Sequence, residues 1–366
     1  MNFTPIVESL PSVVPFVGPE TQERARGRKF RARIGANESV FGPSPRAVEA
    51  MQHAAPEVWK YCDPENHDLK HALAAFHGVG PQNIVVGEGI DGLFGYTVRL
   101  FVEPGVTVAT SLGAYPTFNF HVAGYGGRLV TVSYRDDRED PEALIVLAKR
   151  EAARLIFFAN PDNPMASCWN AETVQWLIDG VPEGSVLCLD EAYSEFAPLG
   201  TTPAIDVSNP HVLRFRTFSK AHGMAGARIG YAIGESELIK SFDKIRNHFG
   251  VNRIAQVGAL ASLQDPAHLA SVVEKVAAAR ERIATIARAN GLKPLPSAAN
   301  FVAIDCCNDG AFARCVLSEL IARDVFVRMP GVSPLDRCIR VSAGLPSDLD
   351  AFEEALPQAL TAATGR

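Results

Sequence analysis

The chain has 366 residues, of which 47% are hydrophobic and 21% charged, and its formal net charge is −6. A mildly acidic chain has no electrostatic surface for nucleic acid or for an anionic membrane, and no apolar run is long enough to span a bilayer. The composition therefore indicates a globular protein with room for two or three domains, and we expect neither nucleic acid nor a membrane among its partners.

The N-terminus and the cysteines indicate a cytoplasmic protein. Residues 1–18 contain Glu8 and several prolines and no cationic stretch before an apolar core, so we expect no secretory signal. The seven cysteines include no CxxC pair. An odd number of cysteines without metal-type spacing is typical of reduced thiols in the cytosol.

Short apolar runs alternate with helical patterns over the first two thirds of the chain. We expect strands at 84–86, 106–109, 155–158, 186–189 and 212–215. These runs do not alternate with polar residues, which is typical of strands covered on both faces in a mostly parallel sheet. Helical patterns lie between them, for example at 68–77 and 171–178. The order predicts an α/β doubly wound large domain over residues 45–250.

The last third has a different organisation. A long helical pattern covers 266–290 and stops at Gly291, a suitable residue just past a helix end. Strands are expected at 301–304, 325–328 and 338–341, with a helix over 311–323. We therefore expect the long connecting helix and a smaller α+β domain in 251–366, joined by an N-terminal arm of residues 1–44.

A lysine after the strand at 212–215 is the first candidate for chemistry. Lys220 stands between the hydroxyls of Thr217 and Ser219 and two glycines, and Arg228 follows eight positions later. The hydroxyls and the arginine could hold a phosphate while the lysine forms an imine with an aldehyde. This pattern points to pyridoxal 5′-phosphate.

Two earlier strand ends add polar groups to this site. Asp190 ends the run at 186–189, and an acid at the carboxyl end of a parallel strand faces the ligand crevice. A pyridine cofactor needs such a carboxylate at its ring nitrogen. Tyr193 and Asn163, in Asn160-Pro161-Asp162-Asn163-Pro164, are candidates for the cofactor's phenolic oxygen, and Asn163 also for the substrate.

A glycine pattern supports a rival hypothesis. Residues 87–92 match GxGxxG after a strand, which by itself is a weak dinucleotide fingerprint. The acid that binds ribose should end the next strand, but Glu103 precedes that strand in a turn. The glycines more simply let the amides of Asp91 and Gly92 meet a phosphate at a helix N-terminus.

Other residues are weaker candidates. Tyr115 could stack on the pyridine ring, and Arg340, a cation in an apolar strand, needs an anionic partner such as a substrate. His67, His71 and His77 suggest a metal site at first sight, but no fourth ligand accompanies them, and we expect no metal.

These segments together resemble fold-type I pyridoxal-phosphate aminotransferases, most closely the histidinol-phosphate aminotransferase family. The likeness extends from Ala36-Asn37-Glu38 to Arg340-Val341-Ser342-Ala343-Gly344. It implies that Asn37, Arg328 and Arg340 bind substrate. It also implies that Tyr61, in the Tyr-x-Asp-Pro motif, reaches the cofactor phosphate of a neighbouring subunit, and hence a homodimer with shared active sites.

The sequence departs from the family pattern twice. Gly89-Ile90-Asp91-Gly92 stands where the family usually has Gly-Ser-Asp-Glu, and Met165-Ala166-Ser167 follows Asn163-Pro164 where Thr-Gly is usual. Asn163 and the backbone amides are kept, so the cofactor assignment is unaffected. The two departures instead concern which amine the protein accepts as its substrate.

The resemblance implies a ping-pong transamination between an amine donor and a 2-oxo acid. Histidinol phosphate and 2-oxoglutarate in histidine biosynthesis are the expected pair. Three alternatives stay open: an aromatic amino-acid aminotransferase, a decarboxylase of a phosphorylated amino acid that also uses pyridoxal phosphate, and a pyridoxal-phosphate-binding module without catalysis. A nicotinamide dehydrogenase rests on the glycine pattern alone.

Overall fold

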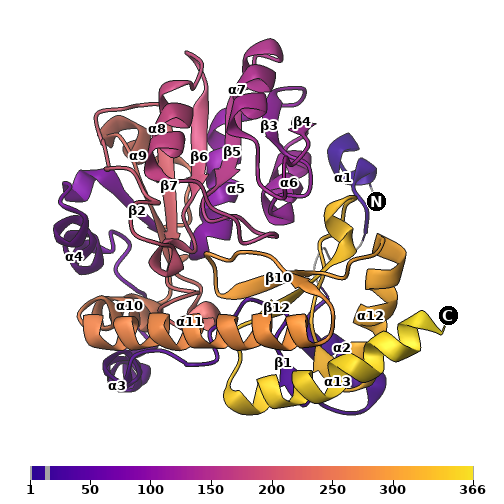
Figure 1. Ribbon diagram of the computed structural model, residues 1–366. Helices are drawn as coiled ribbons and strands as arrows, with labels where there is room; N and C mark the ends of the chain where they lie inside the picture. The colour runs from indigo at the N-terminus through magenta and orange to yellow at the C-terminus, as the bar shows by residue number, and fades with distance from the viewer. Residues whose placement is uncertain (1, 13–16, 366) are drawn as a thin grey trace.

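The computed structural model describes residues 2–12 and 17–365. Its upper part in Figure 1 is built around a seven-stranded sheet with the order β2-β8-β7-β6-β5-β3-β4. The strands are β2 (Ile84–Gly87), β3 (Thr107–Ser111), β4 (Arg128–Val132), β5 (Leu155–Ala159), β6 (Val186–Asp190), β7 (Val212–Thr217) and β8 (Gly230–Ile233). Neighbouring strands from β4 to β7 are parallel, whereas β8 is antiparallel to both β7 and β2. The predicted α/β class with a mostly parallel sheet is confirmed.

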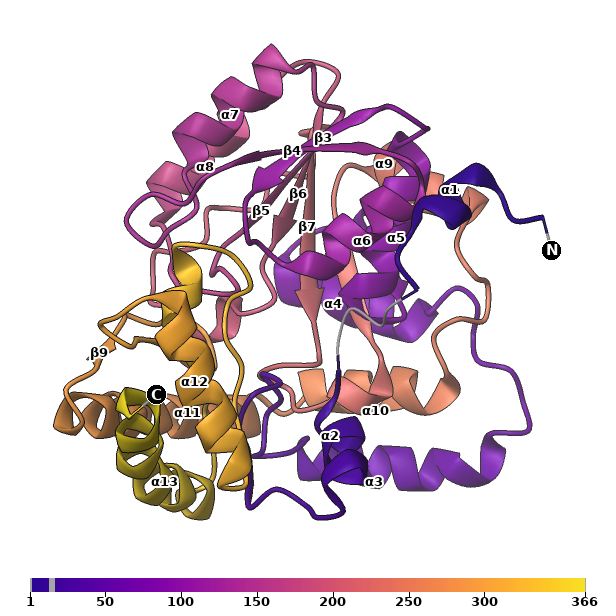
Figure 2. The same cartoon turned by 90° about the vertical axis from the view of Figure 1, so that its right-hand side faces the viewer.

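Helices cover both faces of this sheet, as Figure 2 shows. One face carries α5 (Gly89–Phe101) and α6 (Pro116–Gly124), and the other carries α7 (Pro141–Arg150) and α8 (Ala171–Asp179). Phe94 and Phe118 of the first pair enclose Phe157 of β5, with the Phe118 and Phe157 ring centroids 4.6 Å apart. Because both faces exclude water, the central strands β5 and β6 consist of buried apolar residues without alternation up to Asp190 at the end of β6.

Three helices pack beside the β2 edge: α3 (Pro45–Ala54), α4 (His67–His77) and α10 (Arg253–Leu263). Ala47, Leu73 and Ala255 contribute one side chain from each helix to a buried cluster that also includes residues of β2 and β8. His77 at the end of α4 shares a hydrogen bond of 2.8 Å with the Tyr231 hydroxyl of β8. The cluster therefore joins α10 to the large sheet.

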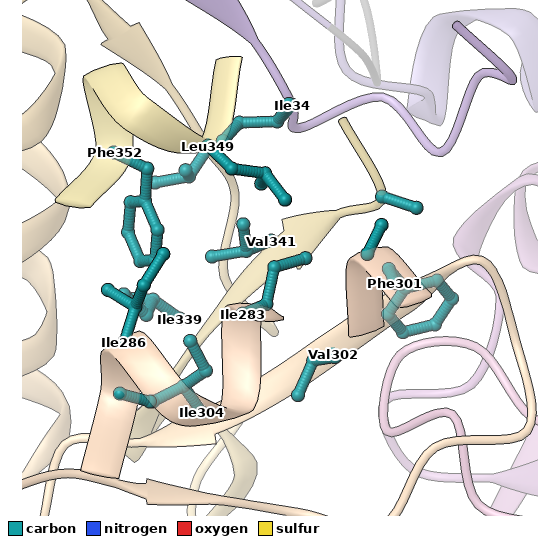
Figure 3. Packing of buried hydrophobic residues seen from close by; sticks show 14 of the residues in the cluster. Ile34, Ile283, Ile286, Phe301, Val302, Ile304, Ile339, Val341, Leu349 and Phe352 are labelled. Atoms are coloured by element: carbon teal, nitrogen blue, oxygen red, sulfur yellow. The ribbon is translucent and has the colours of Figure 1, made fainter. Parts of the chain in front are cut away.

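The lower part is a smaller α+β body. Its sheet has the order β12-β10-β9, in which the central strand β10 (Phe301–Asp305) is antiparallel to both β9 (Lys293–Pro294) and β12 (Cys338–Ser342). It packs against α11 (Pro266–Ala289), α12 (Gly310–Ala322) and α13 (Pro346–Thr364), which enclose the apolar core seen in Figure 3. In that core Ile283 of α11, Val341 of β12 and Phe352 of α13 are completely buried.

The N-terminal part of the chain completes this smaller body. After α1 (Pro5–Ser9) and α2 (Pro19–Arg26), the short strand β1 (Ala32–Arg33) pairs in parallel with β11 (Val325–Phe326). Ile34 then enters the core of Figure 3. Residues from both ends of the chain therefore share one hydrophobic core, which positions the segment from Ala36 onward beside the large sheet.

The structure corrects one predicted strand. Residues 325–328 are paired only over β11, and Arg328 instead forms an isolated bridge with Arg340 of β12. The reason is that the chain leaves β1 after Phe326 and crosses to the other small sheet. In the described part of the chain, every helix is too short or too polar to cross a lipid bilayer.

Candidate active site

A cavity of about 460 Å³ lies at the carboxyl edge of the large sheet, where it faces the smaller body. Loops after β2, β3, β5, β6 and β7 contribute to its wall, because parallel strands end at the same edge. The wall consists of residues 18–20, 36–38, Ile90, Asp91, Tyr115, Asn163, Asp190, Ala192, Tyr193, Thr217, Ser219, Lys220, Ala225, Gly226, Arg228, Arg328 and Arg340. Its size is that of an ordinary small-molecule site.

Lys220 extends into this cavity from the loop after β7. Its Nζ donates a 3.0 Å hydrogen bond to the Asn37 carbonyl and lies 5.4 Å from the centre of the Tyr193 ring. Burial, together with the charge of Arg340, lowers the pKa of Lys220 to about 8, although Asp190 opposes the shift. A lysine with this pKa is deprotonated often enough near neutrality to act as a nucleophile or a base.

Asp190 lies at the carboxyl end of β6, with 6% of its surface exposed. Its Oδ1 accepts a 2.9 Å hydrogen bond from the Ala192 amide. Burial raises the pKa of Asp190 to about 7, and the Ala192 amide and Lys220 oppose this shift. A buried carboxylate with one amide donor favours a cationic partner, and a protonated ring nitrogen is such a partner.

Tyr193 and Asn37 meet on one side of the cavity. The Asn37 amide donates a 3.0 Å hydrogen bond to the Tyr193 hydroxyl, and Asn37 is itself held by Ser342 of β12. The Tyr193 hydroxyl is the acceptor in this contact, so its own proton remains available for a second group. Burial raises the pKa of Tyr193 well above its usual value, which keeps that proton in place.

Asn163 and Arg340 come from opposite bodies and touch each other. Arg340 Nη1 donates a 2.5 Å hydrogen bond to Asn163 Oδ1, which leaves the Asn163 amide group free to donate toward the cavity. The Arg340 guanidinium also lies 5.1 Å from the Phe301 ring centre. Its buried Nε has no hydrogen-bond partner among the described residues. The Arg340 guanidinium therefore has an unused donor with which it can bind an anionic group of a substrate.

Arg328 lines the cavity next to Arg340. The two backbones hydrogen bond to each other across the isolated bridge, and Arg328 Nη2 donates a 2.8 Å hydrogen bond to the Val17 carbonyl. Burial lowers the pKa of Arg328. Arg340 of β12 and Arg328, which is bridged to it, therefore provide a wall for a doubly charged anion.

The opposite end of the cavity is a phosphate cradle formed by the start of α5 and the loop before β8. Gly89 opens α5 with a φ of +76°, and a Cβ on this residue would lie 2.6 Å from Arg228 Nη2. Arg228 Nη1 lies 3.5 Å from the Ser219 hydroxyl, and the Thr217 hydroxyl accepts the Ser219 amide at 3.0 Å. Amides at a helix N-terminus beside an arginine and hydroxyls are a suitable anion site.

Asp91 lines the cradle, but its carboxylate is engaged elsewhere. Asp91 Oδ1 is 3.0 Å from His121 Nε2 of α6. Tyr115, immediately before α6, has its pKa raised by burial and borders the cavity. In the part of the chain that the structure describes, Gly92 and Tyr61 are not in the cavity wall. Tyr61 is 79% exposed and its ring centre lies 4.6 Å from that of Phe249.

Three residues near the cavity were not among the sequence-based candidates. Glu20 and Glu38 line its mouth, and His121 holds Asp91. Glu38 directly follows Asn37 in Ala36-Asn37-Glu38, and this adjacency is the signal in the sequence that places it near the site. Nothing in the sequence places Glu20 or His121 near a ligand, because the folding of α2 and α6 brings them there.

The family model of class I and II aminotransferases matches residues 33–356. The chain belongs to this family. The match covers both bodies of the aminotransferase and almost every residue of the cavity wall. The aminotransferase class and the type I fold expected from the sequence are therefore confirmed.

Curated relatives and a solved structure are similar over nearly the whole aminotransferase. The histidinol-phosphate aminotransferase of Roseiflexus castenholzii is 35% identical, covering 97% of this chain and 97% of that protein. That of Moorella thermoacetica is 31% identical, covering 96% and 92%. The crystal structure of histidinol-phosphate aminotransferase from Sinorhizobium meliloti in complex with pyridoxal-5′-phosphate is 54% identical, with a TM-score of 0.96, covering 98% of this chain and 97% of that one.

The donor set of the cavity fits pyridoxal 5′-phosphate. The cradle provides cations, hydroxyls and helix amides for a phosphate, Asp190 provides a buried carboxylate for a ring nitrogen, and Lys220 provides an amine for an aldehyde. The dinucleotide hypothesis fails on topology. A dinucleotide fingerprint follows a strand of a parallel βαβ unit, whereas β2 lies at the sheet edge and pairs with β8 in antiparallel fashion.

Proposed function

We propose that this aminotransferase exchanges the amino group between histidinol phosphate and 2-oxoglutarate, with pyridoxal 5′-phosphate attached to Lys220. The observation that carries the proposal is the placement of one lysine of lowered pKa between a buried carboxylate, Asp190, and two adjacent arginines, Arg328 and Arg340. When bound, the cofactor supplies a protonated ring that stores the electron pair left as a Cα–H bond breaks.

Lys220 moves the proton in this reaction. Once the incoming amine has replaced it, its Nζ would take the proton from the substrate Cα and deliver it to the cofactor C4′, two bonds away across the amino nitrogen. The lowered pKa supports this role, because a fully protonated lysine could not accept the proton. The Tyr193 ring, 5.4 Å from Nζ, restricts the directions open to the amine.

The other cavity residues hold the cofactor and exclude competing orientations. Asp190 holds the ring nitrogen, while the Tyr193 hydroxyl and the Asn163 amide are the donors available to the phenolic oxygen. Thr217, Ser219, Arg228 and the Asp91 amide hold the phosphate, and Tyr115 covers one face of the ring.

Arg328 and Arg340 bind the substrate anion, with Asn37 and Asn163 beside it. Histidinol phosphate has no α-carboxylate, so the arginines hold its phosphate in one half-reaction and a carboxylate of the oxo acid in the other. A planar guanidinium serves both anions. The names of the curated relatives support this substrate over an aromatic amino acid.

The function is tested with Lys220→Ala and with a substrate panel. We expect Lys220→Ala to lose transamination and the yellow absorbance of the attached cofactor, and retained turnover contradicts the proposal. Unaltered enzyme is then mixed with histidinol phosphate or phenylalanine alone, and the loss of that absorbance is recorded. Conversion by phenylalanine only indicates an aromatic aminotransferase, and CO₂ release without need for an oxo acid indicates a decarboxylase.

We infer a homodimer in which Tyr61 reaches the neighbouring active site. Val58, Trp59, Tyr61 and Phe249 are each at least 50% exposed, and Tyr61 packs on Phe249. Exposed apolar groups of this density are typical of a protein interface. Mixing inactive Lys220→Ala subunits with Tyr61→Phe subunits should form hybrid dimers with one site that keeps both residues. Activity above that of either parent supports sharing, and simple averaging contradicts it.

We also propose the domain division and the location. The small domain comprises the shared core of Figure 3, with residues 1–44 contributing an arm and β1. Because α10 packs with α3 and α4, we place the boundary near Asp265, later than the expected residue 250. Each of the seven cysteines, all within the described residues, is a free thiol, which supports a reducing, cytoplasmic location.

A further inference from the structure

Two buried carboxyl groups lie directly behind the substrate wall and have no role in the proposed chemistry. Asp162 and Glu139 are each 1% exposed. Asp162 immediately precedes Asn163, whose side chain contacts Arg340. Glu139 precedes α7 and is held by the Ser111 hydroxyl at 2.7 Å and the Ala159 amide at 3.0 Å. Neither carboxyl is in the cavity wall formed by the described residues.

The hydrogen bonds of Asp162 fix the turn that carries Asn163. Its Oδ1 accepts from the Tyr134 hydroxyl at 2.8 Å and its Oδ2 from the Met165 amide at 3.1 Å. Its backbone closes the same turn, with the Asp162 amide donating to the Ser167 carbonyl at 2.8 Å. Three hydrogen bonds of Asp162 therefore hold the turn from which the Asn163 side chain contacts Arg340.

The titratable groups around Asp162 come from four different segments. Arg340 of β12 attracts the carboxylate, whereas Asp190 at the end of β6 and Glu139 before α7 repel it. Tyr134, which follows β4, is neutral and donates to it. Arg340 is the nearby cation in this group, and it is also the residue that receives the substrate anion. The ionisation of Asp162 and the occupancy of Arg340 are therefore linked.

We propose that Asp162 is a positioning residue that couples anion binding at Arg340 to proton uptake. This inference rests on the proposed role of Arg340 in substrate binding. With the site empty, the carboxylate of Asp162 is stabilised by Arg340. When a substrate phosphate or carboxylate binds Arg340, Asp162 faces added negative charge, and a larger fraction of Asp162 takes a proton from the solvent and becomes a neutral acid. The proton is released again when the anion leaves.

The burial of Asp162 makes this exchange effective near neutral pH. Burial raises its pKa to about 7, while the hydrogen bonds from Tyr134 and Met165 and the charge of Arg340 oppose the shift. A further rise of about one pKa unit on anion binding would change the protonated fraction at about pH 7 from roughly half to roughly nine tenths. The expected uptake through Asp162 is therefore about 0.4 proton per anion.

The test measures proton uptake on binding of sulfate, which remains a dianion across the neutral range. Calorimetric titrations of the cofactor-loaded enzyme at about pH 7, in two buffers with different ionisation enthalpies, give the protons taken up per sulfate. Asp162→Asn keeps the shape and an acceptor oxygen but cannot titrate. We expect its uptake to be lower than that of the unaltered enzyme by about 0.4 proton. Equal uptake overturns the proposal.

Two matched variants complete the test. Glu103→Gln removes an exposed carboxylate that is outside the cavity wall formed by the described residues, and it should leave uptake unchanged. Tyr134→Phe removes a hydrogen bond that lowers the pKa of Asp162, so the maximum of uptake should move to higher pH. This second variant decides the matter if Asp162→Asn does not fold, and an unmoved maximum then overturns the proposal.

Arg340→Met separates the failure of this inference from the failure of the proposed function. If sulfate binds Arg340→Met as tightly as the unaltered enzyme, the proposed anion site itself is wrong. If Arg340→Met loses sulfate binding while Asp162→Asn keeps full proton uptake, the anion site stands and only the role of Asp162 is wrong. A purely structural role for Asp162 would change stability without changing the number of protons.

Discussion

Gly89→Ala tests the phosphate cradle most directly. Gly89 has a φ of +76°, and an added Cβ would lie 2.6 Å from Nη2 and 3.1 Å from Cζ of Arg228. Real Cβ atoms do not approach so closely, so the guanidinium must move. We expect two effects: a loss of stability from the left-handed backbone, and a loss of phosphate affinity from the displaced arginine.

The two effects have separate magnitudes. A left-handed conformation costs a non-glycine residue about 1–2 kcal/mol of folding free energy. A hydrogen bond to a charged group contributes about 1.5–3 kcal/mol, so losing the Arg228 contact should weaken binding of pyridoxal phosphate by about ten- to 150-fold. Pyridoxal without a phosphate should bind the variant almost as well as the unaltered protein.

Gly105→Ala is the matched control. Gly105 has a φ of +87°, and the described residues place no atom within 4 Å of an added Cβ. It should lose similar stability in urea unfolding and keep full affinity for pyridoxal phosphate in an absorbance titration. The reasoning is refuted if Gly89→Ala binds pyridoxal phosphate normally, or if it weakens pyridoxal and pyridoxal phosphate equally.

Three further predictions concern charged residues. Asp190→Asn should stabilise the cofactor-free protein. In the unaltered protein folding raises the pKa of Asp190 to about 7, so the folded state holds a proton that the unfolded state has lost, and the unaltered protein becomes less stable as pH rises. The gain in melting temperature should therefore grow from about pH 5 to about pH 7 and stay constant above, and a gain that shrinks over this range contradicts the argument. Arg340→Lys should raise the KM for the anionic substrate about ten- to 150-fold, because an ammonium cannot replace the planar fork, and an unchanged KM would show that the anion binds elsewhere. Glu191→Gln should lower the free energy of unfolding by about 3–5 kcal/mol, because Glu191 is 2% exposed and lies 3.5 Å from Arg214 and 3.0 Å from Arg216. A loss below about 1 kcal/mol in urea unfolding, which is the range of a surface ion pair, would show that these ion pairs behave as solvent-exposed ones.

Much of the site could be predicted from the sequence because it depends on the ends of parallel strands. Apolar runs without alternation identified β5, β6 and β7, and the polar residues at or just after their carboxyl ends, Asn163, Asp190 and Lys220, necessarily meet at one edge of the sheet. The pattern of hydroxyls, glycines and Arg228 then indicated a phosphate. These inferences needed only local sequence and the geometry of a parallel sheet.

Tertiary structure alone decided which distant groups complete the cavity. The contact between Asn163 and Arg340 joins residues from the two bodies, and no local pattern specifies how those bodies pack. The reversal of β8, which brings Arg228 to the same edge, is also a matter of sheet pairing. The acids Glu20 and Glu38 reach the mouth because residues near Ile34 are buried in a core made largely by the last third of the chain. Periodicity identifies strands and helices, but the charges that surround Lys220 and set its pKa come from segments that are adjacent only after folding.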